Sequence, residues 1–425
     1  MISLTEELQA RRRVVLDNPP PEAVPYLLAR ERLDERLLVV ARDEARALEL
    51  ARDITTLGRH RATLFLGSEH LPWDGVAPDP VLVGERLALR HAILGAKRPE
   101  VLITTAQTLL ERWLPTQAFQ DASLRLEVDQ FVERQELIAA FIRCGYQRVS
   151  FVEDPGTFAV RGGIVDFFPP ASADPVRLDF FGDDLESIRP FHVQTQAPGK
   201  KFQAATIFPI RDVVYAPERT ERAVRYLRAL GEELLIPSRK LNAIVDDIQR
   251  QDYFFGIESL WPAFYSASEP ILEALVDDET LVVLDEFDQI EEVLQDYYER
   301  AVAAAEQARE AGEPACAVDD FLIEPTAALS VLRKRASVLS FKLVLGKLAS
   351  EARQVSLGNF RALAQEMALR RQDAGRGEIF DPLVSLLQDR FEQDYHVLLT
   401  CANRAQAERL RELLIARKID LPILT

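Results

Sequence analysis

The sequence has 425 residues, of which 48% are hydrophobic and 28% charged. This length predicts two to four domains, each able to bury a core. Acidic residues outnumber basic ones by 68 to 51, and the net charge of −17 argues against a general electrostatic attraction to nucleic acid, although a local basic patch could bind it.

The sequence shows no signal for a membrane or for secretion. No stretch approaches the roughly 20 apolar residues of a membrane span, and the acid-containing N-terminus is unlike a signal peptide. The cysteines, Cys144, Cys316 and Cys401, are odd in number and far apart, which does not fit a disulfide framework. We therefore expect a cytoplasmic protein with reduced thiols and no membrane partner.

Short apolar segments alternate with helical patterns over the first 120 residues. Strands are expected at 37–41, 62–66 and 101–105, and helices at 44–55, 85–95 and 106–114. This alternation is typical of parallel βαβ units in a doubly wound sheet.

The pattern changes after residue 120. A strand at 124–129, a helix at 132–144 and alternating segments between 158 and 193 predict a small antiparallel α+β unit. Helical sequence at 217–251 follows, and 280–286 predicts another buried parallel strand. A parallel sheet that stops and then resumes indicates an inserted domain.

The last hundred residues differ in charge from the rest. Residues 326–425 hold 16 basic and 11 acidic residues, whereas the preceding part is strongly acidic. Together with Gly312 and Pro314, which end a long helical pattern, this change predicts a domain boundary near 315–325. Helices and one strand, at 396–402, are expected beyond it.

The motifs of several enzyme classes are missing. A phosphate-binding loop needs G-x-x-x-x-G-K-[ST], but Gly-Lys occurs only at 199–200 and 346–347, and neither pair is followed by Ser or Thr. The expected first strand leads instead into Arg42-Asp43-Glu44, whose acids would repel a triphosphate. We expect no catalytic residues, no ATP hydrolysis and no bound cofactor or metal.

One short segment points weakly towards nucleotide chemistry. Residues 282–286 form an apolar run that ends in Asp285 and Glu286, as in the magnesium-holding strand of P-loop ATPases. A strand that enters an acidic turn explains the pair equally well. We interpret it as a Walker B-like remnant and predict no metal site.

The segment 176–181, Val-Arg-Leu-Asp-Phe-Phe, alternates with the period of a strand. Its first, third and fifth residues should face the core, whereas Arg177 and Phe181 should face outwards. An outward aromatic residue near an arginine is typical of a protein interface; the alternative is that a neighbouring segment covers Phe181. In the preceding strand pattern, Gly162-Gly163 suggests a bulge or a close backbone approach, and a bulge would redirect Arg161.

These segments resemble a known family. Residues 153–169 (EDPGTFAVRGGIVDFFP), 175–183 (PVRLDFFGD) and 186–189 (ESIR) closely resemble the UvrA-binding domain of bacterial transcription-repair coupling factors. The related excision-repair helicase UvrB is similar but less close. Outside that domain, LPWD at 71–74 and GIE at 256–258 also resemble the coupling factors.

The resemblance implies an α/β architecture with three parts. A degenerate P-loop-type parallel sheet domain would comprise residues 1–122 and 209–318. The UvrA-binding α+β domain, 123–208, would be inserted into it, and a small α/β domain, to which the family assigns no clear role, would follow at 319–425. In this family the first domain has lost its nucleotide site.

The same resemblance implies a recruitment function. The UvrA contacts of the family fall on Arg161, Arg177 and Phe181, so we expect a module that brings UvrA of nucleotide excision repair to stalled transcription. Complete coupling factors add an RNA-polymerase-binding domain, an ATP- and Mg²⁺-dependent DNA-translocating motor and a domain that masks the UvrA site. The chain ends before these parts and looks like an N-terminal fragment or a truncated reading frame, so contacts with RNA polymerase and duplex DNA are not expected from it.

Two other functions are compatible with parts of the sequence. A UvrB-type DNA helicase with ATPase activity would need the missing phosphate loop. A DNA-binding module could use the basic residues 326–425, and its binding would depend steeply on salt.

Overall fold

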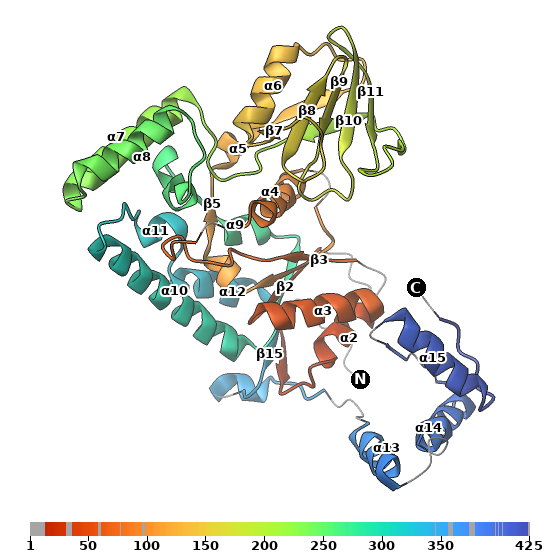
Figure 1. Ribbon diagram of the computed structural model, residues 1–425. Coiled ribbons are helices and arrows are strands. Elements are labelled where there is room, and N and C mark those ends of the chain that lie inside the picture. The colour runs from red at the N-terminus through yellow and green to blue at the C-terminus, as the bar shows by residue number, and fades with distance from the viewer. Residues whose placement is uncertain are drawn as a thin grey trace. The chain divides into compact units, whose positions relative to one another are not determined.

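A computed structural model shows two compact units, Met1–Val355 and Ser356–Thr425 (Figure 1). The structure describes residues 13–30, 36–57, 61–76, 78–95, 98–344, 346–355, 360–373, 379–395, 397, 399–401 and 403–423.

A six-stranded parallel sheet forms the centre of the first unit. Its strands lie in the order β1 (Val14–Asp17), β15 (Ala336–Phe341), β14 (Thr280–Leu284), β2 (Arg36–Ala41), β4 (Val101–Thr105) and β3 (Ala62–Phe65). Every neighbouring pair is parallel. This arrangement confirms the predicted α/β class and the strands expected near 37–41, 62–66, 101–105 and 280–286.

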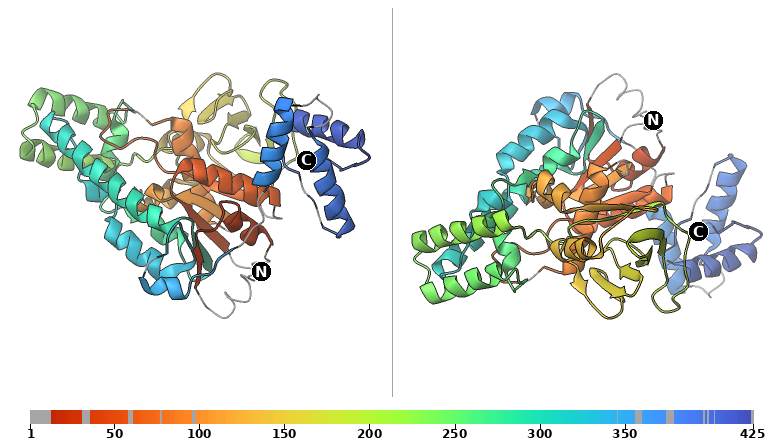
Figure 2. Two further views of the ribbon diagram at one scale, coloured as in Figure 1. Left: turned by 90° about the horizontal axis from the view of Figure 1, so that it is seen from below. Right: turned by 90° about the horizontal axis from the view of Figure 1, so that it is seen from above.

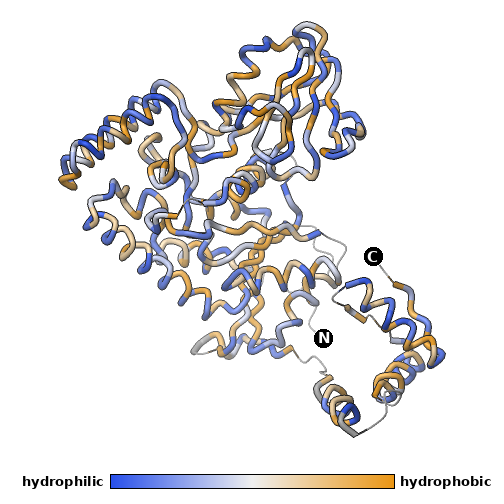
Figure 3. Tube along the Cα trace, viewed as in Figure 1, coloured by the Kyte–Doolittle hydropathy of each residue, from blue (hydrophilic) through white to orange (hydrophobic). Residues whose placement is uncertain are grey.

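Both faces of this sheet are covered, which explains why its strands are continuous apolar runs. Successive residues of β2 belong to different cores: Leu38 and Val40 pack in one, Leu37 and Val39 in the other. Figure 3 shows the hydrophobic residues gathered along these strands. Helices α2 (Ala23–Arg30) and α3 (Glu44–Leu57) contribute to the second core, and α4 (Pro80–Leu94), α10 (Phe287–Glu310) and α12 (Pro325–Arg335) to the first.

A five-stranded sheet is built from residues 147–190. In the sequence these residues lie between the two segments that supply the strands of the parallel sheet. The strand order of the five-stranded sheet is β11 (Asp184–Pro190), β10 (Val176–Phe181), β9 (Ile164–Phe167), β8 (Thr157–Arg161) and β7 (Gln147–Arg148). All pairs are antiparallel except β7 with β8. Helix α6 (Arg134–Arg143) packs against one face, where Phe141 stacks on Phe158 with 4.7 Å between ring centroids. The other face is called the outer face below.

Two smaller antiparallel sheets have two strands each. A ribbon joins β6 (Leu124–Glu127) to β12 (Ala204–Ile207), and β5 (Arg112–Trp113) pairs with β13 (Glu269–Pro270). The remaining helices in the described residues of the first unit are η1 (Gln107–Leu110), α5 (Thr116–Ala122), α7 (Pro217–Glu233), α8 (Ser238–Gln249), η2 (Ile257–Phe264), α9 (Ile271–Leu275), α11 (Val318–Phe321) and η3 (Gly346–Ser350). The α7–α8 hairpin projects away from the parallel sheet in both views of Figure 2.

The helix predicted at 106–114 is wrong. Only the short turn η1 forms, and residues 112–113 leave it to pair with β13. Two causes combine: Pro115 disfavours helical backbone at the residue before it, and Arg112 and Trp113 gain strand partners that local sequence does not reveal.

The first unit extends past the predicted boundary at residue 318. Strand β15, at 336–341, lies between β1 and β14 and completes the parallel sheet. The compact unit therefore runs to Val355.

The second unit is helical in its described residues. It contains α13 (Arg361–Asp373), α14 (Asp381–Glu392) and α15 (Arg404–Ile415), and a small core of Leu387, Leu414 and Ile419. No strand forms at 397 or 399–401, the described residues of the strand predicted at 396–402. A lone strand would leave its backbone groups unpaired, and Val397 and Leu399 instead pack against this core.

Candidate functional site

Strand β10 presents the alternation that its sequence predicts. Val176, Leu178 and Phe180 are buried in the core shared with α6, while the side chain of Phe181 is 75% exposed. The alternative, in which a neighbouring segment covers Phe181, therefore does not hold in the described part of the chain.

Arg161 and Arg177 meet at one buried carboxylate on the outer face. Asp166, in β9, is 1% exposed and pairs with Arg177 across the sheet. Arg177 donates from Nε to Oδ1 at 2.7 Å and from Nη2 to Oδ2 at 2.9 Å, and Arg161 donates to Oδ2. Hydrogen bonding to Asp166 raises the pKa of Arg177, so its guanidinium stays charged. The outer face thus holds two cations in fixed positions.

Aromatic rings support both guanidinium groups. Arg177 lies 4.4 Å from the ring centroid of Phe191, and Arg161 lies 5.0 Å from that of Phe151. Such stacking adds a cation–π attraction and restricts the orientation of the side chain. Gln196 accepts a further hydrogen bond from Arg177.

The paired glycines form a turn, and the predicted bulge is wrong. Arg161 pairs directly with Ile164, so Gly162 and Gly163 are the two turn residues of the β8–β9 hairpin. Gly162 has a φ of 58°, which a tight hairpin turn requires and glycine adopts without strain. The predicted close approach is present at Gly163, where a Cβ atom would lie 2.7 Å from the carbonyl oxygen of Phe180.

Sequence reasoning missed a third arginine on this face. Arg189 forms an ion pair with Asp179 at 2.9 Å, and the Ser187 hydroxyl also donates to Asp179. Arg189 stands directly opposite Arg177 in the β10–β11 ladder. The repulsion between Arg177 and Arg189 is offset because they bind different carboxylates, Asp166 and Asp179. The pairing register of β10 with β11 shifts at Asp179/Phe180, so simple alternation could not place Arg189; its only sequence signal was its place in the ESIR segment.

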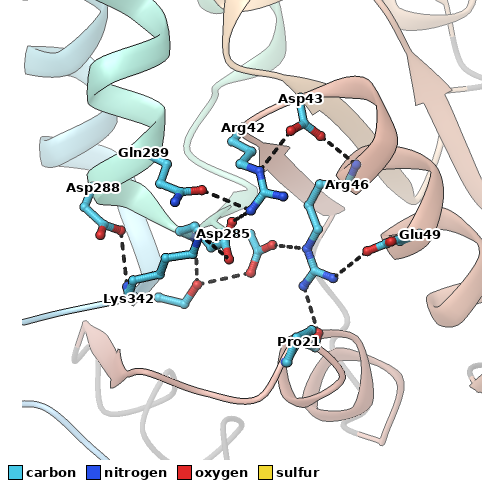
Figure 4. Close-up of polar contacts among 11 residues, drawn as sticks. Pro21, Arg42, Asp43, Arg46, Glu49, Asp285, Asp288, Gln289 and Lys342 are labelled. Carbon is cyan, nitrogen blue, oxygen red and sulfur yellow. Dashed lines mark hydrogen bonds and ion pairs between the residues drawn. The ribbon is translucent and has the colours of Figure 1, made fainter.

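The Walker B-like remnant lies at the carboxyl edge of the parallel sheet, where P-loop folds bind nucleotide (Figure 4). Asp285, 2% exposed, accepts from Arg46 Nε at 2.7 Å and from the hydroxyl of Ser340 at 3.1 Å. Arg46 also donates to the carbonyl of Pro21 at 2.8 Å. Glu286 forms an ion pair with Arg42.

The chain's own guanidinium groups therefore satisfy this acidic pair. Burial by itself lowers the pKa of Arg46, but the hydrogen bond and charge attraction to Asp285, together with Glu49 and Glu286, outweigh burial and raise it. Arg46 remains a cation beside Asp285, in the region where a P-loop ATPase would hold magnesium. Within the described ranges, no three His, Cys, Asp or Glu side chains are grouped so that they could hold a metal ion.

None of the helices in the described part of the chain combines the length and the apolar character that crossing a bilayer requires.

Comparison with known proteins connects the outer face to a family. A family profile, the UvrB interaction domain, matches residues 124–212, which include the whole five-stranded sheet. The chain is 30% identical over 99% of its length to a transcription-repair-coupling factor of Myxococcus xanthus, and covers 36% of that protein. It is 29% identical, over 62% of its length, to the coupling factor of Haemophilus influenzae, of which it covers 23%.

A second kind of relative matches a smaller part of the chain. The chain is 30% identical, over 37% of its length, to UvrABC system protein B of Methanothermobacter thermautotrophicus, and covers 25% of it. In all three cases the chain spans about a third or less of its relative. The chain is a homologue of the transcription-repair-coupling factors that corresponds to their N-terminal region and carries a UvrB interaction domain.

Proposed function

We propose that this chain is a recruitment module that binds UvrA through the outer face of the five-stranded sheet. Arg161, Arg177 and Phe181 are the proposed contacts. The observation that carries the proposal is their common presentation: two arginines held by one buried carboxylate and an exposed phenylalanine on the same face, within the matched UvrB interaction domain.

The geometry of this face suits protein recognition. Arginine and aromatic side chains dominate the energetically important positions of protein interfaces. Asp166 and the stacked rings hold the arginines before any partner arrives, which reduces the entropy lost on binding. In the proposed role the chain binds without catalysing a reaction and needs no cofactor. Contacts with RNA polymerase and DNA would belong to other regions of a full-length coupling factor.

The two other functions have less support. A helicase would need Asp285 to hold magnesium, but Arg46 already forms an ion pair with this carboxylate. The sequence also has no phosphate-binding loop. For DNA binding, many basic side chains of the last hundred residues are paired with acids close to them: Arg333 with Glu291, Arg335 with Asp278, Arg370 with Glu366, Arg404 with Glu408, Arg411 with Asp420 and Arg417 with Asp381.

Calorimetric titration of UvrA into the chain tests the proposal. We expect the wild type to bind and Phe181→Ala to lose on the order of 2 kcal/mol, about 30-fold in affinity. Phe255→Ala is the matched control, since Phe255 is 71% exposed and lies outside the matched domain. Absence of binding by the wild type, or equal losses in the two variants, would contradict the proposal.

A further inference from the structure

A second exposed aromatic side chain lies next to the proposed contacts. On the edge of β11 opposite to β10, Phe131 forms an antiparallel bridge with Asp184. The same Asp184 pairs with Phe181 across the β10–β11 hairpin. Directly opposite residues of antiparallel strands point to the same face. Phe181, Asp184 and Phe131 therefore form a row on the outer face, and strand spacing places the two phenylalanine Cα atoms about 10 Å apart.

The burial of the neighbouring residues agrees with this placement. Phe180, Leu185 and Val132 each stand next to a member of the row in sequence, and all three are buried. Phe131 is 69% exposed and Phe181 75%. Single exposed apolar residues are common on protein surfaces, but two large aromatic rings in one ordered row form a patch of the kind that marks an interaction site.

The backbone around the row is tied down. Val132 donates from its amide to the carbonyl of Asp183 at 2.8 Å, and Leu185 donates to Gln130 at 2.9 Å. These bonds attach the segment that carries Phe131 to β11. The backbone on both sides of Phe131 is thus hydrogen-bonded to the edge of the sheet.

Arg134 connects this segment to both hairpin turns. Its guanidinium donates to the carbonyls of Gly162 at 2.8 Å and Gly182 at 3.4 Å, and lies 4.8 Å from the ring centroid of Phe180. One side chain, three residues after Phe131, therefore fixes the turns that precede β9 and follow Phe181. The two exposed rings belong to one preorganised corner of the domain.

We propose that the UvrA-binding face extends across β11, so that Phe131 and Phe181 together form a two-ring aromatic contact. This inference rests on the proposed function and adds a residue and a direction to it. The complementary surface on UvrA is apolar and wide enough for both rings, with a hydrogen-bond donor or a basic group opposite Asp184, the exposed carboxylate between them.

The test is calorimetric titration of UvrA into the wild type, Phe131→Ala, Phe131→Leu and the control Phe255→Ala. We expect Phe131→Ala to weaken binding about tenfold, Phe131→Leu to recover most of the loss, and the control to bind like the wild type. Because Phe131 is largely exposed, the alanine variant should keep its core, and circular dichroism checks this. Hydrogen exchange on the wild type gives a second readout: UvrA should slow exchange at residues 129–134.

The outcomes separate the two proposals. If Phe181→Ala weakens binding but Phe131→Ala does not, and residues 129–134 gain no protection, the extension to Phe131 is wrong while UvrA recruitment stands. If the wild type does not bind UvrA, the proposed function itself fails.

Discussion

Asp166→Asn is the sharpest test of how the outer face is built, because Asp166 is buried and cannot touch a partner. The substitution keeps the shape of the side chain but replaces one carboxylate oxygen with an N–H donor. Since Arg161 and Arg177 only donate, at least one of the three bonds to Asp166 must break. A charge-assisted hydrogen bond contributes about 1.5–3 kcal/mol. Water can reach both arginines, so we expect a loss near the lower end, about 2 kcal/mol.

Two measurements follow from this loss. Urea unfolding monitored by circular dichroism should show a lower midpoint for Asp166→Asn, and calorimetric titration should show weaker UvrA binding, about tenfold, because the arginines are no longer held in place. Asp296→Asn is the control, since Asp296 also pairs with an arginine, Arg300, but on an exposed helix surface; it should cost at most about 0.5 kcal/mol. If the two variants unfold at the same midpoint and bind UvrA equally well, the reasoning is refuted.

Three further changes probe other contacts. Arg134→Lys removes the planar guanidinium group, whose N–H donors reach both hairpin turns. Hydrogen–deuterium exchange measured by mass spectrometry should then show roughly tenfold faster exchange of the amides at the turns. Arg46→Met leaves Asp285 buried without its cation and should lower the free energy of unfolding by about 3–5 kcal/mol in denaturant titrations, while adding Asp285→Leu should recover most of it. Burial raises the pKa of Asp277, but the hydroxyl of Thr280 and two arginines outweigh it, so the pKa is lowered. This carboxylate therefore stabilises the fold above its unfolded pKa of about 4 and loses that effect as pH falls through its folded value. Asp277→Asn should be less stable than the wild type at neutral pH, and the difference should shrink as the pH falls below about 4.

Each of these predictions has a clear contrary result. Unchanged exchange at the turns in Arg134→Lys would show that the turns hold themselves. An Arg46→Met variant as stable as the wild type would show that solvent already reaches Asp285. A stability difference for Asp277→Asn that stayed constant from neutral to acidic pH would contradict the lowered pKa.

The parallel strands were predictable because burial on both faces requires apolar runs, which are visible without knowledge of the neighbours. Strand β15 was assigned to a later domain because its place between β1 and β14 depends on pairing across more than half of the chain. The segment 106–114 has a helical pattern, but β13 supplies hydrogen-bond partners that compete with the helix. In both cases long-range pairing overrode the local signal.

In the candidate functional site, too, features set by local sequence were predictable, and features set by contacts between distant segments were not. Alternation along β10 placed Phe181 correctly because β10 itself has no irregular residue in its burial pattern. Phe131 carried no such signal, since it makes an isolated bridge outside the named strands. Asp166, which joins Arg161 to Arg177, was not singled out, because a single acid within a strand pattern does not reveal which cations will face it from neighbouring strands.

The order of the strands also has a consequence for biosynthesis. Thr280 of β14 pairs with Arg36 of β2. The edge of β2 that binds β14 therefore stays unpaired while about 240 further residues are made, which takes roughly 12–50 s at ribosomal rates. The five-stranded sheet closes within residues 147–190 and can fold during that interval. Nascent chains would then display a finished outer face while the apolar edge of β2 is still open to aggregation. Destabilising substitutions in β14 or β15 should therefore reduce the yield of protein in cells more than substitutions on the outer face.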